Sequence, residues 1–165
     1  ILGYPVTDYC YMKETMKKSP LIEGLFTISN SAFLGTSEPN DELLKEISPV
    51  YRVTKETPPM FIWSTASDEL VPIQHSIRLT HALADNGVPF ELHVFEEGGH
   101  GLSLGDQTTA EAKTQINKDV QEWILRADKW LMKRFKYDLP ELTEMEIMLQ
   151  KFAEADKGTE KKEKD

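Results

Sequence analysis

The fold is decided by PPMFIWSTASD, residues 58–68, and VPFELHVFEEGGHG, residues 88–101. Each stretch is a short apolar run that predicts a β-strand and ends in a polar loop. The segment between them places apolar side chains at helical spacing, and Gly87 suits the left-handed position that follows a last helical turn. A strand, a helix and a second strand predict two parallel strands with a right-handed crossover. The sequence therefore predicts an α/β fold.

An aspartate and a histidine follow these two strands. Asp68 comes just after the first strand, and His100 comes just after the second with glycines on both sides. Because sites in open α/β sheets form at the carboxyl ends of the strands, we expect the two side chains to lie side by side. An aspartate that orients a histidine base belongs to a hydrolytic triad. On spacing alone, a loop carboxylate and a surface histidine stay open as alternatives.

A nucleophilic serine in a suitable context is missing from the pattern. The stretch GLSLG, residues 101–105, has the letters of a G-x-S-x-G nucleophile elbow. An elbow needs a strand leading into the turn, a helix leaving it, and a serine that precedes the acid and the histidine. Ser103 follows both, so we interpret it as a loop residue.

The rest of the chain divides into two predicted parts. Residues 1–137 form the α/β part, with a strand over residues 1–6 and a lid-like insertion over about residues 12–47 that shows no clean period. Residues 138–165 form a short helix and a disordered charged tail.

Two capping boxes predict helix starts. Thr108 with Glu111 opens a helix that runs to about Lys136, and Thr143 with Glu146 opens the short helix of the tail. Asn40 caps another short helix inside the insertion.

Composition argues against several classes of function. The net charge of -9 argues against a nucleic-acid partner, whose phosphates need a basic surface. Cys10 is the only cysteine, so no internal disulfide or thiolate cluster forms. No apolar run approaches the roughly 20 residues of a membrane span. The spacing of His75, His81 and His93 resembles no metal motif, and we expect neither a metal nor an organic cofactor.

The acid and base loops give the chain a family resemblance. It resembles the carboxyl-terminal part of the α/β-hydrolase superfamily, in the esterase and lipase branch that includes acetyl-xylan esterases. The segments that carry the resemblance are SPV (48–50), PPMFIW (58–63), SDELVP (67–72), GVPFELHVF (87–95) and GGHGLSL (98–104), within about residues 1–136.

The resemblance implies a role for both loops. Asp68 and His100 correspond to the triad acid and base of a serine carboxylic-ester hydrolase, which deacylates small or carbohydrate esters. It also implies about three parallel strands with flanking helices. The first strands of the family, its oxyanion-hole loop and its nucleophile elbow would precede Ile1, so we expect the chain to be a piece of a larger domain and inactive alone.

Three residues at the end of the first strand are candidates for substrate binding. Tyr4, Pro5 and Val6, with the stretch 26–34, would shape an acyl pocket; ordinary core packing is the alternative. The expected partners are a small-molecule ester and either the amino-terminal half of the domain or a second copy of the chain. The outer edge of the first strand would be open. The sheet would also lack the helices that cover the missing half, which would leave Tyr4, Met60 and Ile62 poorly buried.

Two other functions remain open. The chain could be a non-catalytic module that binds a partner or ligand, or part of an α/β-hydrolase peptidase, which uses the same acid and base. The location in the cell is open as well, with the cytoplasm favoured and secretion not ruled out.

Overall fold

The fold was analysed in a computed structural model that describes residues 1–16, 19–135 and 143–149. The chain divides into two compact units, Ile1–Leu131 and Met132–Asp165. In chain order the elements are β1 (Leu2–Gly3), α1 (Tyr9–Met16), α2 (Pro20–Leu34), α3 (Asp41–Ile47), η1 (Pro49–Tyr51), β2 (Met60–Thr65), α4 (Gln74–Asp85), β3 (Phe90–Phe95), η2 (Lys113–Gln115) and α5 (Lys118–Phe135).

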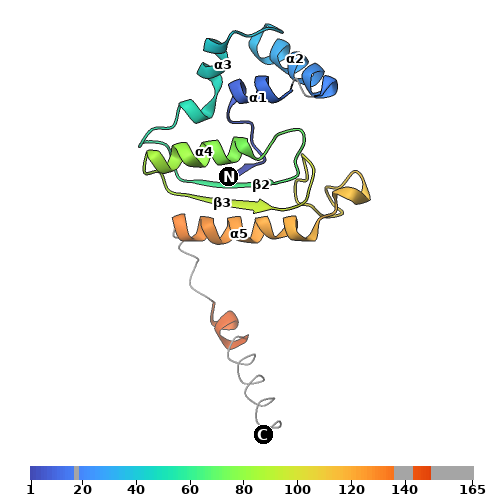
Figure 1. The fold of residues 1–165 in the computed structure, drawn as a ribbon. Coiled ribbons are helices and arrows are strands. Elements are labelled where there is room, and N and C mark those ends of the chain that lie inside the picture. Colours follow the sequence, from blue (N-terminus) through green and yellow to red (C-terminus); the bar gives the residue numbers. More distant parts are fainter. Residues whose placement is uncertain (17–18, 136–142, 150–165) are drawn as a thin grey trace. The chain divides into compact units, whose positions relative to one another are not determined.

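The three strands form one parallel sheet in the order β1-β2-β3 (Figure 1). Leu2 pairs with Ile62, and Ile62 pairs with Leu92. The expected α/β fold with about three parallel strands and flanking helices is confirmed. The strand expected over residues 1–6 is shorter, because Tyr4 has a φ of 39° and leaves the extended conformation.

The sheet carries α4 on one face and α5 on the other (Figure 1). Alternate side chains of β2 enter these two layers, because successive residues of a strand point to opposite faces. Phe61 and Trp63 pack with Val120 and Trp130 of α5, as part of one core cluster. Ile62 packs against α4 and is fully buried, so the expectation that it is poorly covered is wrong.

The segment predicted to be a lid-like insertion is helical. It consists of α1, α2 and α3, with a small core of its own around Met12, Phe26 and Leu44. The amide of Leu43 donates to Asn40 Oδ1 at 2.9 Å, so the predicted cap is confirmed. The sequence of α2 shows no clean apolar period because this helix carries apolar side chains on its buried and on its exposed side. Phe26 is buried, while Ile28 and Phe33 are exposed.

The start of α5 corrects one expectation. Thr108 and Glu111 form no helix start, because Asp106 Oδ1 accepts the Thr108 amide at 2.9 Å and closes a turn there. The helix begins at Lys118. Asn117 Oδ1 accepts the amides of Asp119 and Val120, each at 3.1 Å, and so caps the helix.

Beyond the last residues of α5, the second unit has one described helix, over residues 144–149. The Thr143 amide donates to Glu146 Oε2 at 2.8 Å, and the Glu146 amide donates to Thr143 Oγ1 at 3.3 Å. The predicted capping box is therefore confirmed. The end of the tail, predicted to be disordered, lies outside the described residues. None of the described helices is long and apolar enough to cross a membrane.

Candidate active site

Asp68 and His100 lie side by side. Because β2 and β3 are parallel neighbours, the loops that follow them meet at one edge of the sheet. The distance between His100 Nδ1 and Asp68 Oδ2 is 2.8 Å. The Asp68 carboxylate is buried, whereas 28% of the His100 side chain is exposed. A histidine that has one ring nitrogen against a buried carboxylate, and a ring partly exposed to solvent, can receive a proton from a reacting group.

The two carboxylate oxygens of Asp68 have different partners. Oδ1 accepts the amides of Leu70 and Val71 at 3.0 and 2.9 Å, which fixes the carboxylate in its own loop. Oδ2 remains for the imidazole. With Oδ1 engaged in its own loop, Asp68 presents a fixed acceptor to the imidazole, which suits an acid that orients a histidine base.

The loop that carries His100 is tied to the end of β2. Thr65 Oγ1 donates to the Gly98 carbonyl at 2.7 Å, and the Gly98 amide donates to Ser67 Oγ at 2.8 Å. Gly98 has a φ of +147°, and a Cβ added there would come within 2.7 Å of Leu102 and Thr65. Only glycine fits this position, so the loop has little freedom in placing His100. The sequence indicated the glycines but not the roles of Thr65 and Ser67.

Tyr4 contacts the imidazole from the end of β1. Its ring meets that of His100 edge-on, with centroids 4.8 Å apart at 70°, and it meets Trp63 on another side at 4.9 Å. The positive φ of Tyr4 is uncommon for a large residue and is held by a hydrogen bond of 2.7 Å from its amide to the Trp63 carbonyl. The strained backbone thus places an aromatic ring against the candidate base.

A small apolar cavity of about 230 Å³ opens beside His100. It is formed by side chains of α1, α2, the segment before α1, the Asp68 loop and the loop after β3, among them Val6, Met12, Phe26, Ser29, Val71 and His100. Of the three substrate-binding candidates, Val6 lines this cavity and Tyr4 contacts His100. Pro5 instead lines, with Val6, a different cavity beside β1. The substrate-binding role of all three stays a prediction.

Ser103 lies in a turn after His100 and does not join a strand to a helix. Its φ of 52° is positive, as in a strained turn, but its carbonyl is held by Trp123 Nε1 at 2.8 Å. The elbow arrangement is absent around this serine, in line with its interpretation as a loop residue.

The remaining histidines contact partners other than Asp68. His81 lies 3.0 Å from Asp85, and His93 lies 3.4 Å from Glu91. His75 is buried and accepts hydrogen bonds from backbone amides. Within the described part of the chain, no group of three or more histidine, cysteine or acidic side chains is arranged to hold a metal ion. Cys10 is partly buried.

Comparison with known proteins assigns a family to this geometry. The sequence profile of the prolyl oligopeptidase family matches residues 1–129. Endo-1,4-beta-xylanase B of Butyrivibrio fibrisolvens is 34% identical over 108 residues, which are 64% of this chain and 15% of that protein.

Two solved structures share both fold and sequence with the chain. A sugar hydrolase from Lactococcus lactis is 34% identical with a TM-score of 0.63, over 82% of this chain and 48% of that one. An acetyl ester-xyloside bifunctional hydrolase from Caldicellulosiruptor lactoaceticus is also 34% identical, with a TM-score of 0.62, over 81% of this chain and 41% of that one. The chain therefore spans less than half the length of each of these relatives.

Proposed function

We propose, from the premise that this chain belongs to the prolyl oligopeptidase family of α/β-hydrolases, that it supplies the acid and base of a serine ester hydrolase. The observation that carries the proposal is the 2.8 Å contact between the buried carboxylate of Asp68 and the partly exposed imidazole of His100. The proposed substrate is a short acyl group esterified to a carbohydrate.

The proposed reaction uses both nitrogens of His100. Nδ1–H donates to Asp68 Oδ2, which leaves Nε2 free to take the proton of a serine hydroxyl. The serine oxygen attacks the ester carbonyl, the alcohol departs with the proton from His100, and an acyl-enzyme remains. Water then attacks the acyl-enzyme with His100 again as base. Asp68 stabilises the imidazolium in both steps.

The serine is proposed to come from a complementing segment, the amino-terminal half of an α/β-hydrolase domain. Among the described residues, no serine lies in a strand-turn-helix elbow beside His100. The edge of β1 that faces away from β2 is where such a half would pair, because β1 ends the described sheet.

The size of the cavity beside His100 supports a small acyl group. Its volume of about 230 Å³ is below the roughly 300–1,000 Å³ of sites for larger ligands. The carbohydrate part of the proposal rests on the two solved relatives, one named a sugar hydrolase and one an acetyl ester-xyloside hydrolase. No step requires a metal or an organic cofactor.

A chimera tests the proposal. The carboxyl-terminal part of the Lactococcus lactis sugar hydrolase is replaced by residues 1–135 of this chain, and hydrolysis of nitrophenyl acetate and acetylated xylo-oligosaccharides is measured. We expect turnover that falls by at least about a thousandfold in His100→Ala, since removing a triad member leaves only oxyanion stabilisation and binding. The matched control is His81→Ala, which removes an exposed histidine of α4 and should leave the rate unchanged.

The same chimera distinguishes the alternatives. Hydrolysis of a prolyl-peptide anilide without ester hydrolysis would favour a peptidase, which the family name keeps open. A folded chimera that cleaves neither substrate, with circular dichroism like that of the parent enzyme, would favour a binding module.

A further inference from the structure

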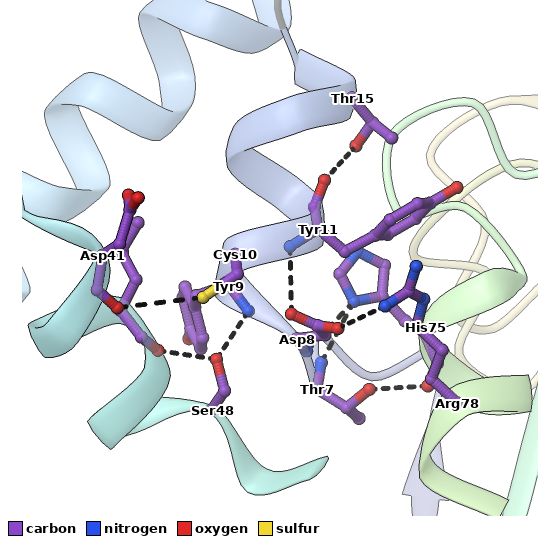
Figure 2. A network of polar contacts seen from close by, with 11 residues as sticks. Thr7, Asp8, Tyr9, Cys10, Tyr11, Thr15, Asp41, Ser48, His75 and Arg78 are labelled. Carbon is purple, nitrogen blue, oxygen red and sulfur yellow. Dashed lines mark hydrogen bonds and ion pairs between the residues drawn. The ribbon is translucent and has the colours of Figure 1, made fainter. Parts of the chain in front are cut away.

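His75 of α4 is a buried histidine that the proposed reaction does not use. Its side chain is enclosed, and its Nδ1 lies 3.3 Å from the amide nitrogens of Thr7 and Asp8, which directly precede α1 (Figure 2). The hydroxyl of Thr7 donates in turn to the carbonyl of His75 at 2.6 Å. One residue of α4 thus receives three hydrogen bonds from two residues that precede α1.

These contacts fix the protonation state of the ring. Both partners of Nδ1 are N–H donors, so Nδ1 must offer its lone pair and carry no hydrogen. The neutral ring therefore carries its hydrogen on Nε2, which is buried with no hydrogen-bond partner among the described residues. A doubly protonated ring would turn Nδ1–H against two other N–H groups and break both hydrogen bonds.

The charged groups around His75 come from three elements. Asp8, at the start of α1, is buried and pairs with Arg78 of α4 at 3.0 Å. Arg78 lies over the ring of Tyr11 at 4.4 Å, and Tyr11 meets the His75 ring edge-on at 5.5 Å. The pKa of His75 is lowered to about 4, chiefly by burial; Asp8 and Asp68 act to raise it and Arg78 acts to lower it.

The same residues organise the first turn of α1. Asp8 Oδ1 accepts the Tyr11 amide at 2.9 Å, which makes Asp8 the cap of this helix. Ser48 Oγ accepts the Tyr9 amide at 2.8 Å from the end of α3. The amides of Thr7 and Asp8 have His75 as their acceptor. The start of α1 is therefore held by side chains from two other elements.

We propose that His75 is a positioning residue, which holds the segment before α1 against α4 through its unprotonated Nδ1 and thereby sets the wall of the cavity beside His100. Val6, directly before this contact, and Tyr9 and Met12, on the helix α1 that follows it, line that cavity. Val71, on the loop that leads from Asp68 into α4, lines it from the other side. The predicted effect of His75 on substrate binding rests on the proposed function, whereas its hydrogen bonds to the segment before α1 are independent of that function.

The first test measures the protonation state of the His75 ring in the chain without any substitution. Long-range ¹H–¹⁵N spectra of the labelled protein report which nitrogen of each histidine carries hydrogen. We expect His75 to show the Nε2–H tautomer throughout pH 5–8. A His75 that carries hydrogen on Nδ1 within this range would overturn the proposal.

Two variants give the second test, through amide hydrogen exchange. Asn Oδ1 is attached at the same position as His Nδ1 and can accept the same amides, whereas Leu fills the space without an acceptor. We expect His75→Leu to speed amide exchange at Thr7 and Asp8 by about tenfold, because the net stabilisation from one or two hydrogen bonds is lost. In His75→Asn the exchange rates at these amides should stay near those of the wild type. His81→Asn and His81→Leu are the matched controls on the same helix. Equal protection in His75→Leu and the wild type, or equal loss in His75→Asn and His75→Leu, would contradict the assignment.

The chimera adds a functional measurement. His75→Leu should raise KM for the acetyl ester by several-fold and change kcat little, because the cavity wall moves while Asp68 and His100 keep their own loops. His75→Asn should restore KM. An equal fall of kcat in both variants would assign His75 to general stability instead. If the chimera proves inactive, the proposed function fails while the tautomer and exchange measurements still decide the role of His75.

Discussion

At the scale of single residues, the two carboxylate oxygens of Asp68 have different partners, and this leads to a specific prediction for Asp68→Asn. Asp68→Asn can keep the contact with the amides of Leu70 and Val71 through its oxygen, but then its NH₂ group faces His100 Nδ1. This selects the tautomer with hydrogen on Nε2, which cannot accept a proton from serine. We expect kcat of the chimera to fall by about 10⁴-fold with little change in thermal stability. A loss under tenfold in steady-state assays would mean that Asp68 does not orient the base.

His75 links stability to pH. Its pKa is about 4 in the folded chain and 6.5 in the ordinary state, so between these values the unfolded chain binds a proton that the folded chain does not. Stability from this group is complete above pH 6.5 and is lost as pH falls from 6.5 through 4. The total is about 3 kcal/mol.

The measurement compares the wild type with His75→Asn in urea unfolding at several pH values. The asparagine variant lacks the titrating group, so the wild type should lose about 3 kcal/mol relative to it between pH 7 and pH 4. Parallel stability curves would show that His75 is protonated in the folded protein.

At the scale of elements, the observed start of α5 can be checked against the start that the sequence suggested. Asn117→Ala removes the acceptor for two amides and should lower the free energy of unfolding by about 1 kcal/mol. Thr108→Ala removes only a loop contact and should change it by less than about 0.5 kcal/mol. Chemical denaturation measures both, and the reverse order would place the helix start at the earlier capping box.

The loop after β3 offers a matched pair of glycines. In Gly98→Ala the new Cβ meets Leu102 and Thr65 at 2.7 Å, whereas nothing lies within 4 Å of a Cβ at Gly99. We expect Gly98→Ala to cost about 1–3 kcal/mol of stability and to lower the rate of the chimera, because His100 is displaced. Gly99→Ala should do neither. Equal melting temperatures for the two variants would show that the loop adapts freely.

The elements that could be predicted from the sequence are those whose residue pattern lies within one short stretch of the chain. The strands β2 and β3 are short apolar runs bounded by prolines and turn residues, and their parallel order follows from the helix between them. The proximity of Asp68 and His100 follows from that order alone. By contrast, α2 is apolar on two sides, so Ile28 and Phe33 blurred its period.

Contacts between distant segments leave no local pattern. Thr65 and Ser67 hold a glycine more than thirty positions later, and the partners of His75 lie 67 and 68 positions earlier. The sequence showed His75 only as an isolated histidine in a helix. Its contacts became visible only once the structure placed α4 beside the segment before α1.

At the scale of the whole molecule, the chain covers part of a larger architecture. The solved relatives are more than twice as long as the segment it matches. Within the described part of the chain, β1 pairs with β2 alone. Beside it lies an apolar cavity of about 300 Å³, lined by Leu2, Pro5, Val53, Met60 and Leu79 among others. An unpaired edge next to apolar side chains is a surface on which another chain can add a strand.

We therefore expect the chain not to be a free monomer in solution. Ile1, more than half exposed, lies beside this edge, and pairing along β1 with a second copy or a complementing half would cover both it and the cavity. Light scattering at micromolar concentration should give a mass above 18.9 kDa, with a melting temperature that rises with protein concentration. Ile1→Lys should weaken this association, because a charge on an edge strand opposes pairing, while Phe33→Lys on the exposed side of α2 should not. A monomer with one sharp transition at every concentration would instead mean that three strands and their helices suffice for a stable core, which would favour an independent binding module over half of an enzyme.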